Sequence, residues 1–161
     1  MDFQESQVQL QENSDGTSTL QMLLLGEIDP WWGLNSESVY QTLRQHKNIS
    51  AIDLVLSSPG GSVTDALIIY NMLKSHSAKV IVYPMGLVAS AATIIASAAD
   101  EIHISKQCIY MIHRSSAYAS GNANELEKTA GTLRAFDELI VDGLTEGFCG
   151  GVGTWIRSGR L

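Results

Sequence analysis

The sequence predicts an α/β domain whose strands are largely parallel. Apolar runs typical of buried strands recur at residues 20–28, 51–58 and 79–84. A segment with apolar residues at helical spacing follows each run, and this alternation favours parallel strands joined by right-handed crossovers. The chain has 161 residues, a length suited to one domain with a substantial core.

Composition and charge narrow the class of protein. The chain is 45% hydrophobic and 17% charged, values typical of a soluble globular domain rather than a disordered one. Its formal net charge of −7 argues against partners such as nucleic acid and anionic membranes, since both require a basic surface. The two cysteines, Cys108 and Cys149, form no disulfide framework, and we expect reduced thiols in a cytoplasmic protein.

Two stretches need separate interpretation. Residues 1–18 are polar and acidic, lack the pattern of a signal peptide, and are predicted to be a flexible arm. The uncharged residues 80–99 have the length of a membrane span. Pro84, Gly86 and Ser90 interrupt this stretch, so a strand, a turn and a buried helix are the better interpretation.

The first two helices follow recognisable turns. The sequence DPWWG at 29–33 is a turn, after which Asn35 or Ser36 caps a helix. The sequence PGG at 59–61 ends the second strand, and a second helix follows it. The apolar positions of the two helices are Val39, Tyr40, Leu43, Ala66, Ile69, Tyr70 and Leu73.

The C-terminal part contains two short predicted strands, at 101–105 and 108–113, and one long amphipathic helix. Asn122, with Glu125 three residues later, resembles a capping box and marks the start of that helix. The apolar side of the helix is formed by Leu126, Ala130, Leu133, Ile140 and Leu144.

Three features with chemical potential fall at predicted strand ends: the PGG turn, Ser90 and His113. In parallel sheets, active sites collect where a strand turns into a helix. A serine hydroxyl is a weak nucleophile and needs a base, usually a histidine, within hydrogen-bond reach. His113 ends an apolar strand and is the predicted base. The other histidines have the surroundings of surface residues: His46, His76 and His103.

The same segments offer donors for an oxyanion. Ser90 stands at the start of a helix, where N–H groups are free and the dipole is positive, so Ala91 N–H is one candidate. Gly61 N–H is the second, because glycine lets backbone approach a ligand closely.

Each feature also has a plain structural interpretation: a packing serine, a structural histidine and an ordinary turn. Their joint occurrence at strand ends of one sheet indicates a site. No metal or organic cofactor is implied, since the chain has no ligand cluster, GxGxxG or P-loop.

Three segments resemble the proteolytic subunit family of Clp proteases, and they occur in the same order: LSSPGGSVTDALIIYNML at 56–73, MGLVASAATIIASAADEI at 85–102 and IYMIHRS at 109–115. The segments LLLGEIDPWWG and GTWIRSG resemble the phage and prophage branch of that family, the head-maturation type. The resemblance implies a Clp protease/crotonase-like fold of spiral βαβ units with a long C-terminal helix. It also implies a serine endopeptidase whose functional positions are Ser90 as nucleophile, His113 as base, and Gly61 with Ala91 as oxyanion hole.

The acid that completes the family's triad is not found, so the third residue is unknown. In the phage-type pattern this acid directly precedes Thr-Trp, where the present chain has Gly153. Asp137 and Asp142 lie on the long helix, and the preferred interpretation places both on its solvated face. A backbone carbonyl, a water or another subunit is then left to hold His113. We expect one Clp-protease-like domain over residues 19–161, truncated at its C-terminus relative to the family.

The resemblance further implies a homo-oligomeric ring that encloses its active sites and stacks through the long helix. A peptide or protein substrate is implied, with an ATP-dependent unfoldase or phage capsid proteins as partners, in a bacterial or phage-infected cytoplasm. Of the adjacent Trp31 and Trp32, one is either a ring contact or a cover over the core of its own chain. Two alternatives stay open: a catalytically incomplete assembly protein, and an acyl-CoA enzyme of the crotonase type, against which the serine–histidine pair argues.

Overall fold

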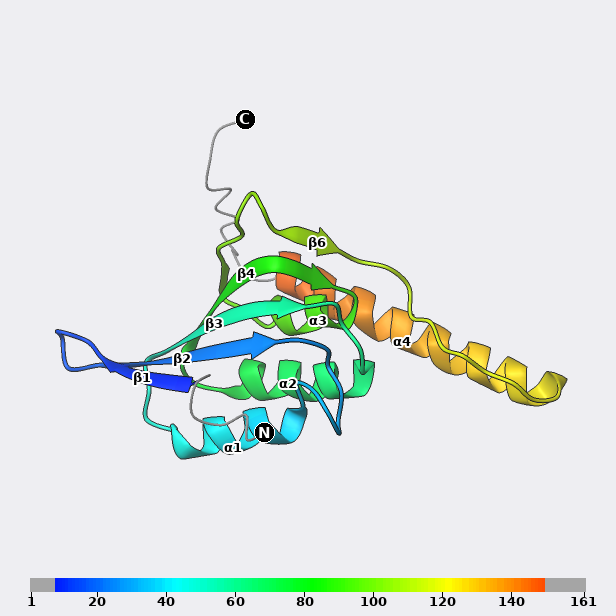
Figure 1. Cartoon of the computed structure of the whole chain (residues 1–161), viewed down its shortest axis with the longest axis horizontal. Helices are drawn as coiled ribbons and strands as arrows, with labels where there is room; N and C mark the ends of the chain where they lie inside the picture. Colours follow the sequence, from blue (N-terminus) through cyan, green and yellow to red (C-terminus); the bar gives the residue numbers. More distant parts are fainter. Residues whose placement is uncertain (1–7, 150–161) are drawn as a thin grey trace.

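The computed structural model describes residues 8–149, which contain six strands and four helices (Figure 1). The elements are β1 (Val8–Glu12), β2 (Ser18–Leu25), α1 (Ser36–Gln45), β3 (Ala51–Ser58), α2 (Val63–Ser75), β4 (Lys79–Ala89), α3 (Ala91–Ser97), β5 (Glu101–Ile102), β6 (Ile109–Met111) and α4 (Ala123–Cys149). They build one sheet in the order β1-β2-β3-β4-β5, and β6 pairs with the C-terminal end of β4. Only the β1–β2 pair is antiparallel, so the predicted α/β class is confirmed.

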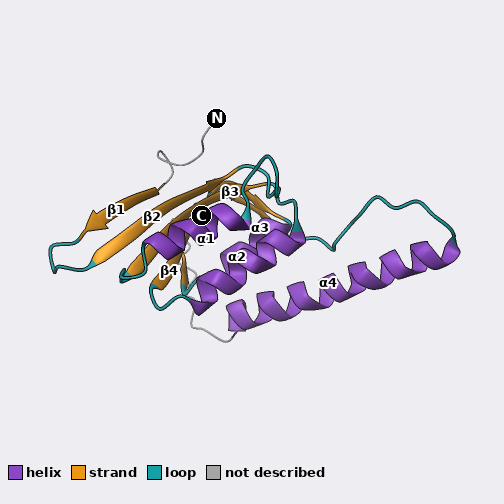
Figure 2. Cartoon of the chain, turned by 90° about the horizontal axis from the view of Figure 1, so that it is seen from below, coloured by secondary structure: helices purple, strands orange, loops and turns teal. Residues whose placement is uncertain are grey.

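The core lies between one face of the sheet and the helices α1, α2 and α3, which cover that face (Figure 2). Along β2, Leu20, Met22 and Leu24 are buried, and the residues between them are half-buried. β3 continues this alternation, because successive side chains of a strand point to opposite faces. The short helix α3 is buried over its whole length, which explains why its sequence is rich in alanine.

The starts of α1 and α2 are tied together at the carboxyl end of the sheet. Asn35 caps α1, since its side-chain oxygen accepts from Ser38 N–H at 2.9 Å. Ser62 caps α2. The buried Asp65 carboxylate joins both helices, because it accepts from Ser36 Oγ at 2.7 Å and from Ser62 Oγ at 2.9 Å.

Strand β4 is longer than the predicted strand at 79–84. It runs through Pro84 to Ala89, and its pairing with β3 shifts register between Leu56 and Ser58. A proline donates no ladder hydrogen bond, so it is tolerated at such an irregularity. Residues 80–99 thus form a strand and a buried helix, as predicted. Among the described helices, none is both long enough and apolar enough to cross a bilayer.

Residues 8–18 differ from the flexible arm that the polar composition predicts. They form β1 and a tight turn, which places Leu10 opposite Leu20 in an antiparallel hairpin. Gly16, with φ +82°, closes the turn by donating to the Asn13 carbonyl at 3.1 Å. The alternation of Val8 and Leu10 with glutamines is a strand signal that the acidic composition conceals. The rest of the predicted arm, residues 1–7, lies outside the described residues.

The long helix α4 packs on α3 by its C-terminal part, and its N-terminal part projects away from the sheet (Figure 1). Residues 112–122, called the strap below, run from the end of β6 alongside α4 to its start (Figures 1 and 2). The predicted capping box is confirmed, since Asn122 and Glu125 exchange side-chain-to-backbone hydrogen bonds. The predicted apolar side is only partly covered: Leu126 is exposed and Ile140 is half-buried, and the Leu144 side chain lies outside the described residues.

Candidate active site

Ser90 occupies the turn between β4 and α3. Its φ is 55° and its ψ −129°, and it is the only non-glycine residue with a positive φ in the described chain. Such a conformation costs about 1–3 kcal/mol and persists only where the surrounding structure enforces it. Ser90 N–H donates to the Met111 carbonyl at 2.9 Å, which ties the turn to β6. The Ser90 hydroxyl does not cap α3 and is left available for chemistry.

The PGG turn packs directly on Ser90. A Cβ added to Gly60 would lie 2.6 Å from the Ser90 Cβ and 2.8 Å from the Ala89 carbonyl oxygen, so only glycine fits. On its other side the turn bonds to Ile28: Ile28 N–H donates to the Gly60 carbonyl, and Ser62 N–H donates to the Ile28 carbonyl, both at 2.8 Å. Sequence reasoning singled out the PGG turn, but it missed Ile28 and the contact of Gly60 with Ser90, because both depend on contacts between distant segments. Ile28, Gly60, Gly61 and Ser90 are called the corner below.

The two predicted oxyanion donors belong to this corner. Ala91 is the first residue of α3, so its N–H has no partner within the helix. The bridge to Ile28 uses the Gly60 carbonyl and the Ser62 N–H, which leaves the Gly61 N–H outside it. Gly61 has φ +135°, and a Cβ there would collide with the Ile28 carbonyl oxygen. Both amides are therefore compatible with donation to a ligand oxygen.

His113 follows β6 on the strap. The parallel register of β4 and β6 pairs Ala89 with Met111, and Ser90 N–H donates to the carbonyl of Met111, which is two residues before the histidine. His113 Nδ1 lies 2.6 Å from the Arg114 carbonyl oxygen. Because a carbonyl only accepts, Nδ1 carries the hydrogen, and the neutral ring has its lone pair on Nε2. The ring is exposed, and the described part of the chain contains no hydrogen bond between it and the Ser90 hydroxyl.

Asp137 does not lie on a solvated face, so that prediction is wrong. Its side chain is half-buried, and its Oδ1 accepts from Ser115 N–H at 2.7 Å. Asp142 is exposed, as predicted. Helical periodicity could not reveal the difference, because it does not show that the strap folds back along one side of α4. Gly153, at the position of the family's acid, lies outside the described residues.

Other titratable side chains have different roles. His76 Nδ1 accepts from a backbone amide at 3.0 Å, and the His103 ring stacks on Tyr83 with 5.3 Å between centroids. Burial raises the pKa of the Cys108 thiol, so this cysteine stays protonated and is a poor nucleophile. Burial also raises the pKa of the Tyr110 phenol, which therefore adds no negative charge beside β4.

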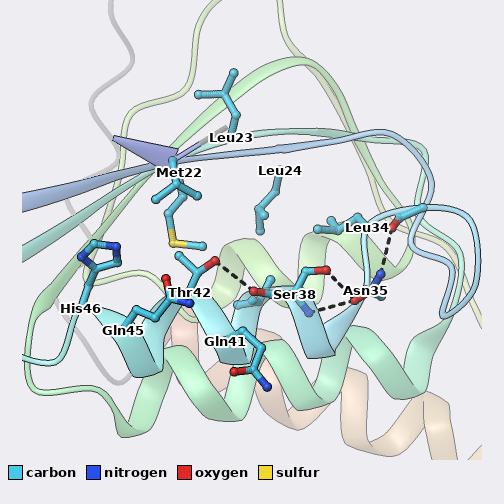
Figure 3. A pocket seen from close by; sticks show the side chains of 13 residues that line it. Met22, Leu23, Leu24, Leu34, Asn35, Ser38, Gln41, Thr42, Gln45 and His46 are labelled. Atoms are coloured by element: carbon cyan, nitrogen blue, oxygen red, sulfur yellow. Dashed lines mark hydrogen bonds between the residues drawn. The ribbon is translucent and has the colours of Figure 1, made fainter. Parts of the chain in front are cut away.

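A hollow of about 390 Å³ lies between β2 and α1 (Figure 3). Met22 and Leu24 form part of its apolar lining, and polar side chains of α1 form its rim. Some of these rim groups bond to neighbouring residues of the chain, since Ser38 N–H donates to Asn35 Oδ1 and the Thr42 hydroxyl donates to the Ser38 carbonyl. None of the predicted site residues lines this hollow. Within residues 8–149, no group of three His, Cys, Asp or Glu is arranged to hold a metal ion.

Trp31 and Trp32 both point to solvent and are 81% and 91% exposed. Their backbone N–H groups both donate to Asp29 Oδ1 at 2.8 Å, which holds the loop in a tight turn. Neither indole covers the core of its own chain. The ring contact expected of one tryptophan stays a prediction.

Comparison with known proteins points to one family. The family described as Clp protease matches residues 18–148. The chain is 34% identical over 97 residues to ATP-dependent Clp protease proteolytic subunit 1 of Corynebacterium jeikeium, covering 56% of this chain and 52% of that protein. It is also 34% identical over 115 residues to proteolytic subunit 2 of Treponema denticola, covering 68% and 56%. A solved ClpP1 variant from Listeria monocytogenes superposes with a TM-score of 0.67 and 28% identity, covering 81% of this chain and 72% of that one. The chain spans about half the length of the two curated relatives.

Proposed function

The chain belongs to the Clp protease family, and we propose that it hydrolyses peptide bonds as a serine endopeptidase, through an acyl-enzyme on Ser90. The observation that carries the proposal is the strained backbone of Ser90, at φ 55°, in a turn against which the PGG segment packs directly. Strain of this kind is retained where a nucleophile must be lifted out of a strand-to-helix turn.

The proposed reaction uses three parts of the site. His113 Nε2 takes the hydroxyl hydrogen of Ser90 while Oγ attacks the carbonyl carbon of the substrate. The N–H groups of Gly61 and Ala91 donate to the oxyanion that forms. The C–N bond then breaks, the imidazolium gives its hydrogen to the leaving amine, and an ester on Ser90 remains. Water, deprotonated by His113, hydrolyses the ester and restores both residues.

Assembly and partners are part of the proposal. Exposed apolar residues on α4, including Leu139 and Val141, support burial against further copies in a homo-oligomeric ring. The names of the relatives, ATP-dependent proteolytic subunits, support an ATP-dependent unfoldase partner. The two segments that resemble the phage branch, LLLGEIDPWWG and GTWIRSG, support a capsid or scaffold protein as substrate, in a bacterial or phage-infected cytoplasm.

A catalytically incomplete assembly protein is the second candidate. The observation that favours it is that His113 is exposed and makes no hydrogen bond to the Ser90 hydroxyl in the described structure. Catalysis would then require closure of the strap on substrate or ring formation, whereas an assembly protein requires neither.

Labelling with a fluorophosphonate probe tests the proposal. We expect covalent labelling of the wild type, no labelling of Ser90→Ala and strongly slowed labelling of His113→Ala. Ser116→Ala, in the same strap, and His46→Ala, far from it in sequence, are matched controls that should label like the wild type. A folded, assembled wild type that does not label would favour the assembly protein. Acyl-CoA turnover that survives Ser90→Ala would instead favour the crotonase type.

A further inference from the structure

One peptide group joins Asp137 to His113. Asp137 Oδ1 accepts a hydrogen bond from Ser115 N–H at 2.7 Å. The Arg114 carbonyl, which belongs to the same peptide unit, lies 2.6 Å from His113 Nδ1. The Arg114–Ser115 peptide therefore stands between a carboxylate and the imidazole, with a short hydrogen bond on each side.

A peptide group can transmit such a contact. It is planar, and because the described chain has no cis peptide bond, its N–H and C=O point in opposite directions. A carboxylate that accepts from the N–H pushes electron density toward the carbonyl oxygen, since hydrogen bonds in a chain polarise one another. Hydrogen bonds to an ionised acceptor are also stronger than neutral ones. Asp137 thus orients the Arg114 carbonyl and makes it a better acceptor for His113 Nδ1–H.

The same contact anchors the strap. Between residues 112 and 122, every residue is exposed except Ser115, whose hydroxyl is enclosed and has no hydrogen-bond partner. The strand before the strap is short, because β6 pairs with β4 over three residues and ends at Met111. The Asp137 bond is therefore the attachment that fixes the peptide following His113.

We propose that Asp137 is a positioning residue of this site, which holds His113 in its Nδ1–H tautomer through the Arg114–Ser115 peptide. Nε2 thereby keeps its lone pair, which accepts the Ser90 hydrogen. In a triad, an acid in direct contact with the histidine has this role. No proton crosses the peptide, because the carboxylate acts by orientation and polarisation alone. The catalytic role of Asp137 rests on the proposed endopeptidase function. The effect of Asp137 on the tautomer of His113 does not rest on it.

Four variants of the full chain test the inference. Asp137→Ala removes the acceptor of Ser115 N–H. We expect fluorophosphonate labelling of Ser90 to slow by about 10- to 100-fold, which corresponds to the loss of one hydrogen bond to a charged group. Asp137→Asn keeps a neutral acceptor for Ser115 N–H and should slow labelling less. Asp142→Ala removes an exposed carboxylate from the same helix, and Ser116→Ala removes an exposed hydroxyl from the strap, so both should label like the wild type.

A second measurement does not depend on activity. In protein labelled with ¹⁵N-histidine, the shifts of the two ring nitrogens of His113 report which one carries the hydrogen. We expect the Nδ1–H form in the wild type and in Asp142→Ala, and a shift toward the Nε2–H form in Asp137→Ala.

The two measurements separate the possible failures. Unchanged labelling in Asp137→Ala overturns the inference, and so does slowed labelling with an unchanged His113 tautomer, which indicates a merely structural role. If the wild type does not label, the endopeptidase proposal fails, and the tautomer alone decides the inference. A tautomer that moves in Asp137→Ala but not in Asp142→Ala then supports the peptide link, and one that stays overturns it.

Discussion

The corner and the strap carry the two halves of the candidate site, and they are built in different ways. In the corner, backbone hydrogen bonds of 2.8 Å join Ile28 to the PGG turn, and Gly60 packs on Ser90 so closely that it leaves no space for a side chain. The strap is exposed apart from Ser115, and a single side chain from α4 bonds to it there. The proposed nucleophile is therefore placed by the packed carboxyl end of the sheet, whereas the proposed base is placed by a contact with the long helix α4.

This difference has a practical consequence. Substitutions in the corner should change the stability of the whole domain, because its hydrogen bonds and contacts are continuous with the core. Loss of the Asp137 contact with the strap should change the chemistry of His113 with little effect on unfolding. Stability and labelling measured on the same variants separate the two halves.

The largest effect is expected for Gly60→Ala. The new Cβ would meet the Ser90 Cβ at 2.6 Å and the Ala89 carbonyl at 2.8 Å, at a φ of +102°. Overpacking and strain together should lower the free energy of unfolding by about 3 kcal/mol. Gly26→Ala is the matched control, with φ +94° and open space around it, and should cost only about 1 kcal/mol. Urea unfolding measures both, and equal losses would show that the contact with Ser90 does not matter.

Asp65→Ala should have the next largest effect, since it removes the acceptor that joins α1 to α2. Burial by itself raises the pKa of this carboxyl, but the hydrogen bonds from Ser36 and Ser62 outweigh it, and the pKa lies below the ordinary 3.8. The contribution is thus present above that value and lost as the pH falls through the lowered pKa. We expect Asp65→Ala to lose about 2 kcal/mol near neutral pH and less in acid.

Urea unfolding of Asp65→Ala at several pH values checks this expectation. The wild type should lose stability relative to the variant as the pH falls below about 4, because protonation weakens the bonds to both serines. A difference between the two proteins that is constant with pH would contradict the assignment.

Ser90→Gly should stabilise the domain relative to Ser90→Ala. Alanine keeps a Cβ at φ 55°, whereas glycine adopts this conformation without the steric cost. We expect a difference of about 1 kcal/mol in favour of glycine, measured by thermal unfolding, with labelling absent in both variants. Equal stability of the two variants would mean that the Ser90 backbone stores no strain.

The smallest effects on unfolding are expected for exposed aromatic residues of either half. Trp31→Ala beside the corner and Tyr118→Ala on the strap should each change the free energy of unfolding by less than about 0.5 kcal/mol, since neither side chain is buried. Sedimentation velocity on the same variants tests the ring-contact interpretation of the tryptophans. A shift to smaller species in Trp31→Ala, and not in Tyr118→Ala, would support it.

The local elements of this protein are readable from its sequence. Alternating apolar residues predict β3 with its observed bounds, and the pair Asn122 and Glu125 predicts the start of α4. The capping residues Asn35 and Ser36 predict the start of α1 to within one residue, and the observed cap is Asn35. These features depend on residues within a few positions of one another, so period and capping chemistry suffice to identify them. The resemblance of the PGG, Ser90 and His113 segments to one family likewise lies in short stretches of sequence.

Only the tertiary structure decided how those stretches meet. Gly60 packs on Ser90, and Ile28 forms backbone hydrogen bonds with the PGG turn. Asp137 accepts a hydrogen bond from the peptide after His113, and each of these contacts joins residues far apart in sequence. Such contacts depend on strand register, on how tightly the backbone packs, and on which side of α4 the strap covers. The residue types of the site were set by the sequence alone, but the positions from which they can act together were set by packing between distant segments.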